Sequence, residues 1–478
     1  IPANKNVLLK RGYVVNADSI ERGDVKIENG TIMEVGKIIR PTDDFLTLDV
    51  AGMFIMPGGI DPNTHLDYTY KNIKTVDDFY YGTRAAVAGG TTMIMDFVMP
   101  QIGESMEDAY RKWRRRADTE VVCDYALHMG ITWWDDDVEK EMSQVAISCG
   151  INGFLINMAF KRQFMLNDAE IYQACMRCKE IGALPMFHAE NGTIIDENVR
   201  QLLNKGIRGV EGHYLSRPQD VEEEATLRAC TIAKQVQSPL YFCNVMSKPA
   251  ADIIIRKRRE GVTVFGETIP AALGGVGQKI EGHNFRIAAA HVTCPPISDD
   301  ESTPTELMQM LANEELNTTG SNNCTYDSDQ KARGKHNFSR IPYGVNGVED
   351  RMSVIWEKGV NSGILTPSQF VAITSTNAAK LFNVFPKKGA IKPGSDADIV
   401  VWNPKRMKVI SHHNHRQAVD YNIFTGMYIH GGPEYVFVKG NLCVENDVLR
   451  FKKGYGNYIH TQCFSQMAYP RKLEGDKT

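Results

Sequence analysis

The sequence lacks any run of about 18 apolar residues, the length that a membrane-spanning helix needs. It also lacks a strong charge of either sign, because the formal net charge is -4 over 478 residues. Nucleic-acid-binding proteins are typically basic, so the charge does not favour that function. The start, IPANKNVLLKRG, has no basic segment followed by an apolar core, and we expect no secretory signal. We therefore expect a cytoplasmic protein without a membrane span.

Two cysteine pairs at the spacing of a zinc knuckle are lacking as well. The ten cysteines are scattered, and several lie in apolar or helical contexts, which is typical of reduced, buried thiols. Cys175 and Cys178 form a single CxxC within a stretch that reads as a helix. No second pair accompanies them, so we favour a structural role over a redox or metal role.

Both ends of the chain have the pattern of short β-strands. Residues 1–55 alternate apolar runs with turn signals, and residues 386–455 repeat this pattern. Examples are NVLLKRGYVVN, GDVKIENGTIMEVG, ADIVVWNP and YVFVKGNLCVEND. We predict one composite β domain made of these two segments, followed by an extension over residues 456–478.

Residues 56–385 alternate short β-rich runs with helical stretches. TTMIMDFVMP, LPMFHAEN and VTVFGETI are such runs, and VEEEATLRACTIAKQV is such a helix. This order is typical of parallel βα units, and enough of them occur to close a (β/α)8 barrel of the α/β class. The active site of such a barrel lies at the carboxyl ends of its strands.

Two basic clusters fall in predicted helices, RKWRRRAD at residues 111–118 and IRKRREG at residues 255–261. Cations on a helix usually form a solvated outer face, which is the interpretation that we favour. A surface for an anionic partner stays open as the alternative.

A series of motifs runs in order along nearly the whole chain: PGGIDPNTHL, GTRAAVAGGTTMIMDFVMP, HAENG, NVMSK, GSNNCTY, GVNGVEDRMSVIWEKGV and TSTNAAKLFNVFPKKGAIKPGSDADIVVW. In these motifs the sequence resembles the dihydropyrimidinases of the amidohydrolase superfamily. The resemblance implies a (β/α)8 TIM-like barrel with a small β-sandwich domain built from both termini. For an active member it also implies two zinc ions, held by a His-x-His pair, a carbamylated Lys, two further His and an Asp.

Four of these six metal-binding positions carry other residues in this chain. Matching the motifs one at a time gives, in order, Asn63, His65, Leu155, His188, Asn244 and Asn322. A leucine cannot form a carbamate, and neutral amides are weak zinc ligands. We therefore expect no catalytic residue, no metal and no cofactor, and interpret the six as vestigial metal-site positions.

Three further positions match the substrate pocket of the family. Phe160 lies where the family has a Tyr whose hydroxyl steadies the reaction intermediate. Cys294 and Asn346 correspond to segments whose backbone contacts the ring. Such contacts would allow ring binding without hydrolysis.

Two residual chemistries stay open at this stage. One is a single zinc ion on His65 and His188, although a stable zinc site needs three or four ligands. The other is a nucleophilic thiol at Cys294 or Cys324, which would need a base such as either histidine.

A dihydropyrimidinase scaffold without its metal ligands resembles the collapsin response mediator proteins, or dihydropyrimidinase-related proteins. This implies a non-enzymatic cytoskeletal adaptor and signalling scaffold for axon growth and guidance, located with the cytoskeleton in neurites. The implied partners are further copies in a homotetramer or hetero-oligomer, tubulin or microtubules, and motor or membrane-skeleton adaptor proteins, with no nucleic acid. The family continues into a phosphorylated tail, so we expect residues 456–478 to begin a truncated tail. The replacements match no particular vertebrate member and favour a divergent invertebrate relative.

Two rival functions stay open beside the adaptor that we predict. The first is a cyclic-amide hydrolase with residual or altered activity, against which Leu155 is the strongest argument. The second is a small-molecule sensor that uses the old pocket, which Phe160 would make more apolar.

Overall fold

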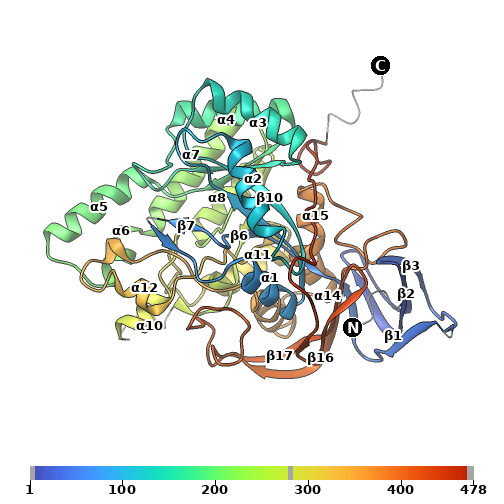
Figure 1. Cartoon of the computed structure of the whole chain (residues 1–478). Helices are drawn as coiled ribbons and strands as arrows, with labels where there is room; N and C mark the ends of the chain where they lie inside the picture. Colours follow the sequence, from blue (N-terminus) through green and yellow to red (C-terminus); the bar gives the residue numbers. More distant parts are fainter. Residues whose placement is uncertain (1–5, 43, 71, 278–283, 471–478) are drawn as a thin grey trace, which may run out of the picture.

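Eight parallel strands form the barrel of this computed structural model, which describes residues 6–42, 44–70, 72–277 and 284–470 (Figure 1). The strands follow one another around the sheet in chain order, and a bridge between Thr64 and Asn323 joins its two ends. The strands are β6 (Gly59–Thr64), β9 (Thr91–Val98), β10 (Asp124–Ile131), β11 (Gly153–Asn157), β12 (Leu184–His188), β13 (Leu240–Phe242), β14 (Val264–Thr268) and β15 (Thr318–Thr319).

The barrel strands are buried on both faces. Every residue of β9, TTMIMDFV, is buried, and so is every residue of β10. Parallel strands that are covered on both sides carry near-continuous apolar sequences rather than alternating ones. This explains why the strands of the middle segment read as short apolar runs.

Helices between the strands form the outer layer of the barrel. They are α1 (Phe79–Ala88), α2 (Met106–Ala117), α3 (Asp136–Ser148), α4 (Asp168–Ile181), α5 (Gly192–Asn204), α6 (Glu211–Ser216), α7 (Gln219–Val236), α8 (Lys248–Arg259) and α11 (Thr303–Ala312). The sequence sets their ends locally. In α4, Asn167 and Glu170 form a capping box, and Gly182 ends the helix with a φ of 71°.

Shorter helical segments complete the barrel. They are α9 (Pro270–Leu273), α10 (Phe285–Ala290), α12 (Ser328–Ala332), η2 (Phe338–Arg340), α13 (Arg351–Ile355), η3 (Trp356–Val360), α14 (Pro367–Val371), η4 (Ala372–Thr376) and α15 (Asn377–Leu381). A small hairpin, β7 (Thr69–Tyr70) with β8 (Ile73–Lys74), follows the first barrel strand. No helix in the described ranges is long and apolar enough to cross a membrane.

A second, nine-stranded sheet combines strands from the two terminal segments. Its strands are β1 (Asn6–Asn16), β2 (Ser19–Glu28), β3 (Thr31–Gly36), β4 (Phe45–Asp49), β5 (Phe54–Pro57), β16 (Ile399–Val409), β17 (Tyr428–Val438), β18 (Asn441–Glu445) and β19 (Val448–Leu449). In Figure 1, β1–β3 lie beside β16 and β17. The two halves meet where β5 pairs antiparallel with β16. The predicted barrel with a β domain from both termini is confirmed, while the exact domain boundaries stay a prediction.

A buried lysine connects the barrel, the second sheet and the C-terminal segment. Lys388 Nζ lies 2.5 Å from Asp124 Oδ2 of β10 and also bonds to Asp398, just before β16. Asp124 Oδ1 in turn accepts a hydrogen bond from the backbone N–H of Asn457 at 2.9 Å. The residues after the second sheet therefore pack against the barrel.

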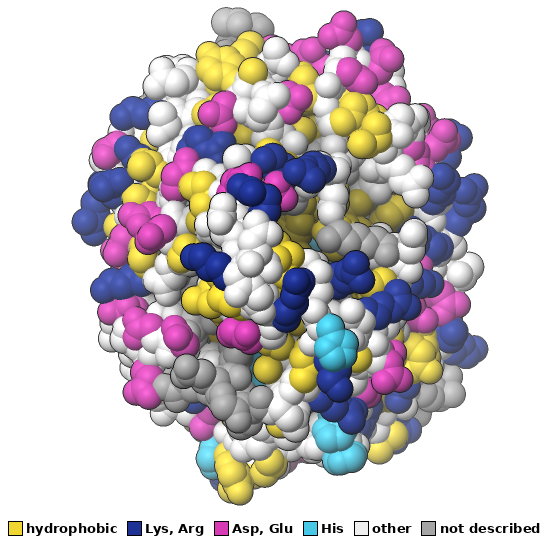
Figure 2. Space-filling view, turned by 90° about the vertical axis from the view of Figure 1, so that its left-hand side faces the viewer, with side chains coloured by type: hydrophobic (Ala, Val, Ile, Leu, Met, Phe, Trp, Pro, Cys, Tyr) yellow, Lys and Arg dark blue, Asp and Glu magenta, His cyan; other side chains and the backbone are white. Residues whose placement is uncertain are grey.

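The surface carries mixed charges. Figure 2 shows the face on the left of Figure 1, where acidic and basic side chains are interspersed. This face is hollowed near its centre, hydrophobic side chains are visible in the hollow, and Lys and Arg side chains lie around it.

Candidate functional site

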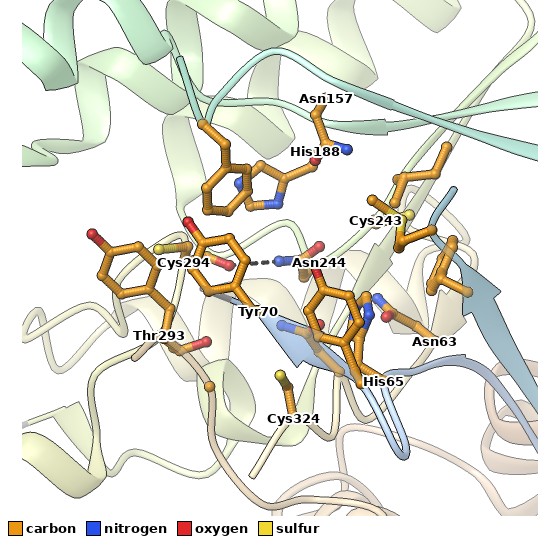
Figure 3. A pocket seen from close by; sticks show the side chains of 18 of the residues that line it. Asn63, His65, Tyr70, Asn157, His188, Cys243, Asn244, Thr293, Cys294 and Cys324 are labelled. Carbon is orange, nitrogen blue, oxygen red and sulfur yellow. Dashed lines mark hydrogen bonds between the residues drawn. The ribbon is translucent and has the colours of Figure 1, made fainter. Parts of the chain in front are cut away.

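A cavity of about 100 Å³ lies at the carboxyl ends of the barrel strands (Figure 3). Segments that are far apart in the sequence form its wall, because the ends of parallel strands meet at one edge of the barrel. Eight of the nine predicted positions line it: Asn63, His65, Leu155, Phe160, His188, Asn244, Cys294 and Asn322. The ninth, Asn346, does not line it. Its side chain instead accepts a hydrogen bond from Ile423 N at 2.9 Å.

Aromatic rings cover one side of the cavity. The ring of Phe160 lies 5.0 Å from that of Phe164, 5.2 Å from that of His188 and 6.1 Å from that of Tyr70, between centroids. Tyr343 continues this wall, 6.3 Å from Phe160. Such a wall suits a flat ring, which can pack face or edge against it.

The residues at the replaced metal positions have partners within the protein. Asn63 Nδ2 donates to Glu267 Oε1 at 2.7 Å, and Asn244 Nδ2 donates to the carbonyl of Cys294 at 2.9 Å (Figure 3). The backbone N–H of Asn322 donates to the carbonyl of Asn63 at 2.9 Å. Leu155 is buried and contributes only apolar surface. Burial raises the pKa of Glu267 to about 7.

His65 is neutral at physiological pH. Its ring stacks on Phe97, with 5.0 Å between the centroids and 18° between the planes. Burial, and then the nearby His188, lower its pKa to about 4, against the effect of a hydrogen bond with Asn322.

His188 belongs to a buried chain of polar groups. Its Nε2 lies 3.0 Å from Glu190 Oε2, and Arg217 Nη1 lies 2.5 Å from the same oxygen. Burial alone would raise the pKa of Glu190, but the charge of Arg217 and the hydrogen bond with His188 outweigh it and lower the pKa to about 2. An ionised Glu190 accepts a hydrogen bond from Nε2–H, so the other ring nitrogen, Nδ1, carries the free lone pair.

Two buried amide atoms at the cavity have no partner among the residues that the structure describes. Asn63 Oδ1 is an acceptor without a donor, and Asn157 Nδ2 is a donor without an acceptor. Buried polar atoms are nearly always paired, so this donor and this acceptor require an explanation. Asn157 was not predicted from the sequence, although a polar residue that ends the apolar strand GFLIN is a usable signal.

The donor set does not fit a two-zinc centre. The six positions supply two imidazoles, three neutral amides and one alkyl group, with no carboxylate and no lysine. Within the described ranges, the one group of three ligand side chains close enough to share an ion is Asp124, Asp396 and Asp398. Lys388 already pairs with each of these carboxylates.

The thiols do not favour a nucleophile either. Burial raises the pKa of Cys324 to about 12, so its thiol is protonated near neutral pH. A reactive cysteine needs the opposite shift.

Comparisons with known proteins link the chain to enzymes. The model of the Amidohydrolase family matches residues 54–443. The chain is 49% identical to the dihydropyrimidinase of Rattus norvegicus, over 99% of this chain and 92% of that protein. It is 43% identical to dihydropyrimidinase-related protein 5 of Homo sapiens, over 100% and 84%. The crystal structure of dihydropyrimidinase from Brevibacillus agri NCHU1002 has a TM-score of 0.94 and 36% identity, over 96% of this chain and 99% of that one.

These findings show that the predicted non-enzymatic cytoskeletal adaptor is wrong. Identity to the rat enzyme, at 49%, exceeds that to the human related protein, at 43%. The description as a pseudoenzyme fails with it, and tubulin partners, a neurite location and a role in axon guidance gain no support. The error has a physical cause. Lost metal ligands remove one chemical route, but they specify no partner surface, and the pocket itself persists.

Proposed function

Because the chain belongs to the amidohydrolase family, we propose that it binds small cyclic amides in the pocket at the barrel mouth. We propose further that it opens these rings slowly, using water and His188 in place of a metal centre. The residues present do not fit the two zinc ions of the family, so no step of this proposal passes through a metal.

The unpartnered pair of amide atoms carries the proposal. A cyclic amide presents an N–H donor beside a C=O acceptor, on one edge of a flat ring. Both residues line the cavity, and with their amides turned into it Asn63 Oδ1 would accept from the ring N–H and Asn157 Nδ2 would donate to the ring carbonyl. A buried group left unpaired costs about 1–3 kcal/mol, so pairing both atoms favours such a ligand over an apolar one.

The aromatic wall supports the same ligand class. Phe160, Phe164 and Tyr70 offer ring faces and edges to a flat molecule. A cavity of about 100 Å³ has room for several waters and therefore for a small ring.

The chemical step uses groups that the pocket contains. His188 takes a proton from a water molecule, and the water oxygen attacks the ring carbonyl. The ring C–N bond then breaks, and the proton passes from His188 to the leaving nitrogen. One water is consumed and one ring-opened acid forms. Glu190, itself held by Arg217, orients the imidazole.

We expect this route to be slow because it relies on a single general base. One positioned general base contributes about 10²–10⁴-fold to a rate. Phe160 has no hydroxyl to stabilise the intermediate, and the amide nitrogen of Asn244 is already bonded to Cys294. We therefore expect turnover above the uncatalysed rate but far below that of a metal-dependent hydrolase.

The test measures binding and turnover separately. Chelator-treated protein is titrated with hydantoin and 5,6-dihydrouracil, and ring-opened product is then quantified over long incubations. Binding with slow turnover that His188→Ala abolishes, and that the exposed His413→Ala leaves unchanged, supports the proposal. Binding without turnover overturns the hydrolytic half, and absence of binding overturns the whole.

We also propose that the six matched positions are the remains of a metal site. Their support is geometric, because Asn63, His65, Leu155, His188, Asn244 and Asn322 come together at one cavity although they are spread over 260 positions of sequence. We propose common ancestry with the dihydropyrimidinase-related branch, without its function. These replacements and the identity of 43% to a human member support this proposal.

We also propose that the chain forms a homotetramer, and the fold that it shares with the solved relatives supports this proposal. Exposed apolar side chains support self-association through the second sheet: Met407 is 71% exposed and Tyr428 is 69% exposed, on the paired strands β16 and β17. Light scattering should then give a mass near four times 53.5 kDa. A monomeric mass would contradict it.

A reducing compartment, the cytoplasm, is the location that we propose. All ten cysteines are free thiols, and nine of them are buried. Cys175 and Cys178 lie inside the packed face of α4, where burial raises the pKa of Cys175 to about 12. Such thiols serve packing rather than redox chemistry.

A further inference from the structure

A second hollow adjoins the ring-binding cavity. It is a groove of about 860 Å³ between α2, the hairpin that follows β6, and the segment after β9. Four residues line both the cavity and the groove: Tyr68, Tyr70, Met99 and Phe164. The two spaces therefore share one wall, and a ring in the cavity could extend a substituent into the groove.

The groove is cationic on the side formed by α2. Its charged lining residues are Lys112, Arg115, Arg116 and a single acid, Glu104. The three cations are spaced three and four residues apart, so they lie on one face of the helix. They belong to the basic cluster at residues 111–118, which the sequence alone favoured as a solvated face.

Most cations of this cluster already have partners. Arg111 pairs with Glu107, and Arg114 pairs with Asp118. Lys112 pairs with Glu104.

Arg116 is held by two further contacts. It lies 3.0 Å from Asp67 Oδ2 and stacks over the ring of Trp113 at 4.2 Å.

Arg115 differs from its neighbours. It is exposed, it lines the groove, and it forms no ion pair or hydrogen bond with any residue that the structure describes. A guanidinium is a rigid fork of donors that suits a carboxylate or a phosphate, which it can bind through two parallel hydrogen bonds.

From this arrangement we propose that the groove is a subsite for an anionic arm on the ring ligand, with Arg115 as the residue that binds the acid. The inference rests on the proposed function, because the ring occupies the first cavity. The ligand class is then a cyclic amide with a substituent that ends in a carboxylate or another oxyanion. The aromatic side chains Tyr70, Trp113 and Phe164 would pack along the apolar part of the arm.

The test compares acids with neutral isosteres of equal length. Calorimetric titrations use the full chain with hydantoin, hydantoin-5-acetate, hydantoin-5-propionate and the two corresponding amides. We expect at least one acid to bind about tenfold more tightly than its amide at low salt, since a charge-assisted hydrogen bond is stronger than a neutral one. Arg115→Gln should remove this preference and leave the affinity for unsubstituted hydantoin unchanged.

Arg111→Gln is the matched control, because Arg111 lies on the same helix, pairs with Glu107 and does not line the groove. A preference for acids that survives Arg115→Gln, or that Arg111→Gln removes equally, overturns the subsite. If hydantoin binds but the acids and amides bind with equal affinity, the subsite is overturned and the proposed ring binding is not. Absence of binding by every ring compound overturns the proposed function together with it.

Discussion

At the scale of single residues, the decisive changes are four side chains in one cavity. Asn63, Leu155, Asn244 and Asn322 occupy positions where the resemblance implies metal ligands, and each is accommodated by packing or by hydrogen bonds within the protein. The site is thus not a metal centre with missing parts. It is a polar and aromatic pocket with its own bonding pattern.

Reversal of the four residues together should restore metal binding. The variant Asn63→His, Leu155→Lys, Asn244→His and Asn322→Asp supplies imidazole and carboxylate ligands and a lysine that can be carbamylated. We expect two metal ions per chain by elemental analysis after exposure to zinc and bicarbonate, with less than one in the unmodified protein. A folded quadruple variant that binds no metal would contradict the assignment of these positions.

Asn157 permits a test that separates binding from stability. Its Nδ2 is buried without a partner, so the variant Asn157→Leu should unfold at the same or a higher temperature. The affinity for hydantoin should fall by about two- to tenfold, because one hydrogen bond to the ring is lost. Loss of thermal stability with unchanged affinity would show that Asn157 is structural.

The sequence predicted part of the pocket because the motifs identified strand ends. Eight of the predicted positions line it, while the lining residues Asn157 and Tyr70, and Glu190 beside His188, were not predicted because no motif assigns a role to them. Asn346 was assigned to the pocket through the backbone of its segment, and that contact stays a prediction. Its amide faces Ile423 and Asp350.

At the scale of elements, α7 carries an acid that makes the stability depend on pH. Glu222 is buried, and its Oε1 accepts a hydrogen bond from the backbone N–H of Met246, at 2.8 Å, beside the start of α8. Burial raises its pKa from 4.5 to about 8. Burial therefore favours the protonated form of Glu222 in the folded protein, although the hydrogen bond from Met246 by itself favours the carboxylate.

The sign of the pH effect follows from this shift. A raised pKa in the folded state means that the stabilising contribution is complete below the unfolded value and is lost as the pH rises through about 8. Relative to Glu222→Gln, which stays neutral, the native protein should lose up to a few kcal/mol between about pH 5 and about pH 9. Parallel thermal unfolding curves of the two proteins across this range would contradict the assignment.

The elements themselves were largely predictable, and the reason is local. Caps such as Asn167 with Glu170 mark helix ends in the sequence, and buried parallel strands read as apolar runs. The groove beside α2 was not predictable. Arg115 lacks an ionic partner because Glu104, Asp67 and Asp118 pair with other cations of α2. Spacing along the helix does not predict where these three acids lie in three dimensions.

At the scale of the whole molecule, Lys388 joins the parts that the sequence separates. It bonds to Asp124 of the barrel and to Asp398 and Asp396 near the second sheet, and all but Asp396 are fully buried. Burial alone would lower the pKa of Lys388, but these carboxylates outweigh it and raise the pKa.

Removing the lysine should therefore destabilise the protein strongly. Lys388→Met leaves the buried Asp398 without its paired cation and Asp124 with Lys439 alone, and we expect a loss of about 3–5 kcal/mol in the free energy of unfolding. The exposed Lys392→Met, four residues along, should change it little. Equal effects of the two substitutions in urea denaturation would contradict the role of Lys388.

A calorimetric titration of chelator-treated protein with hydantoin tests directly whether the pocket binds cyclic amides. We expect saturable binding of one ring per chain without any metal, and its loss in Leu155→Trp, where an indole fills the cavity. Absence of saturable binding, or binding that persists when the cavity is filled, would contradict the claim that this pocket binds cyclic amides.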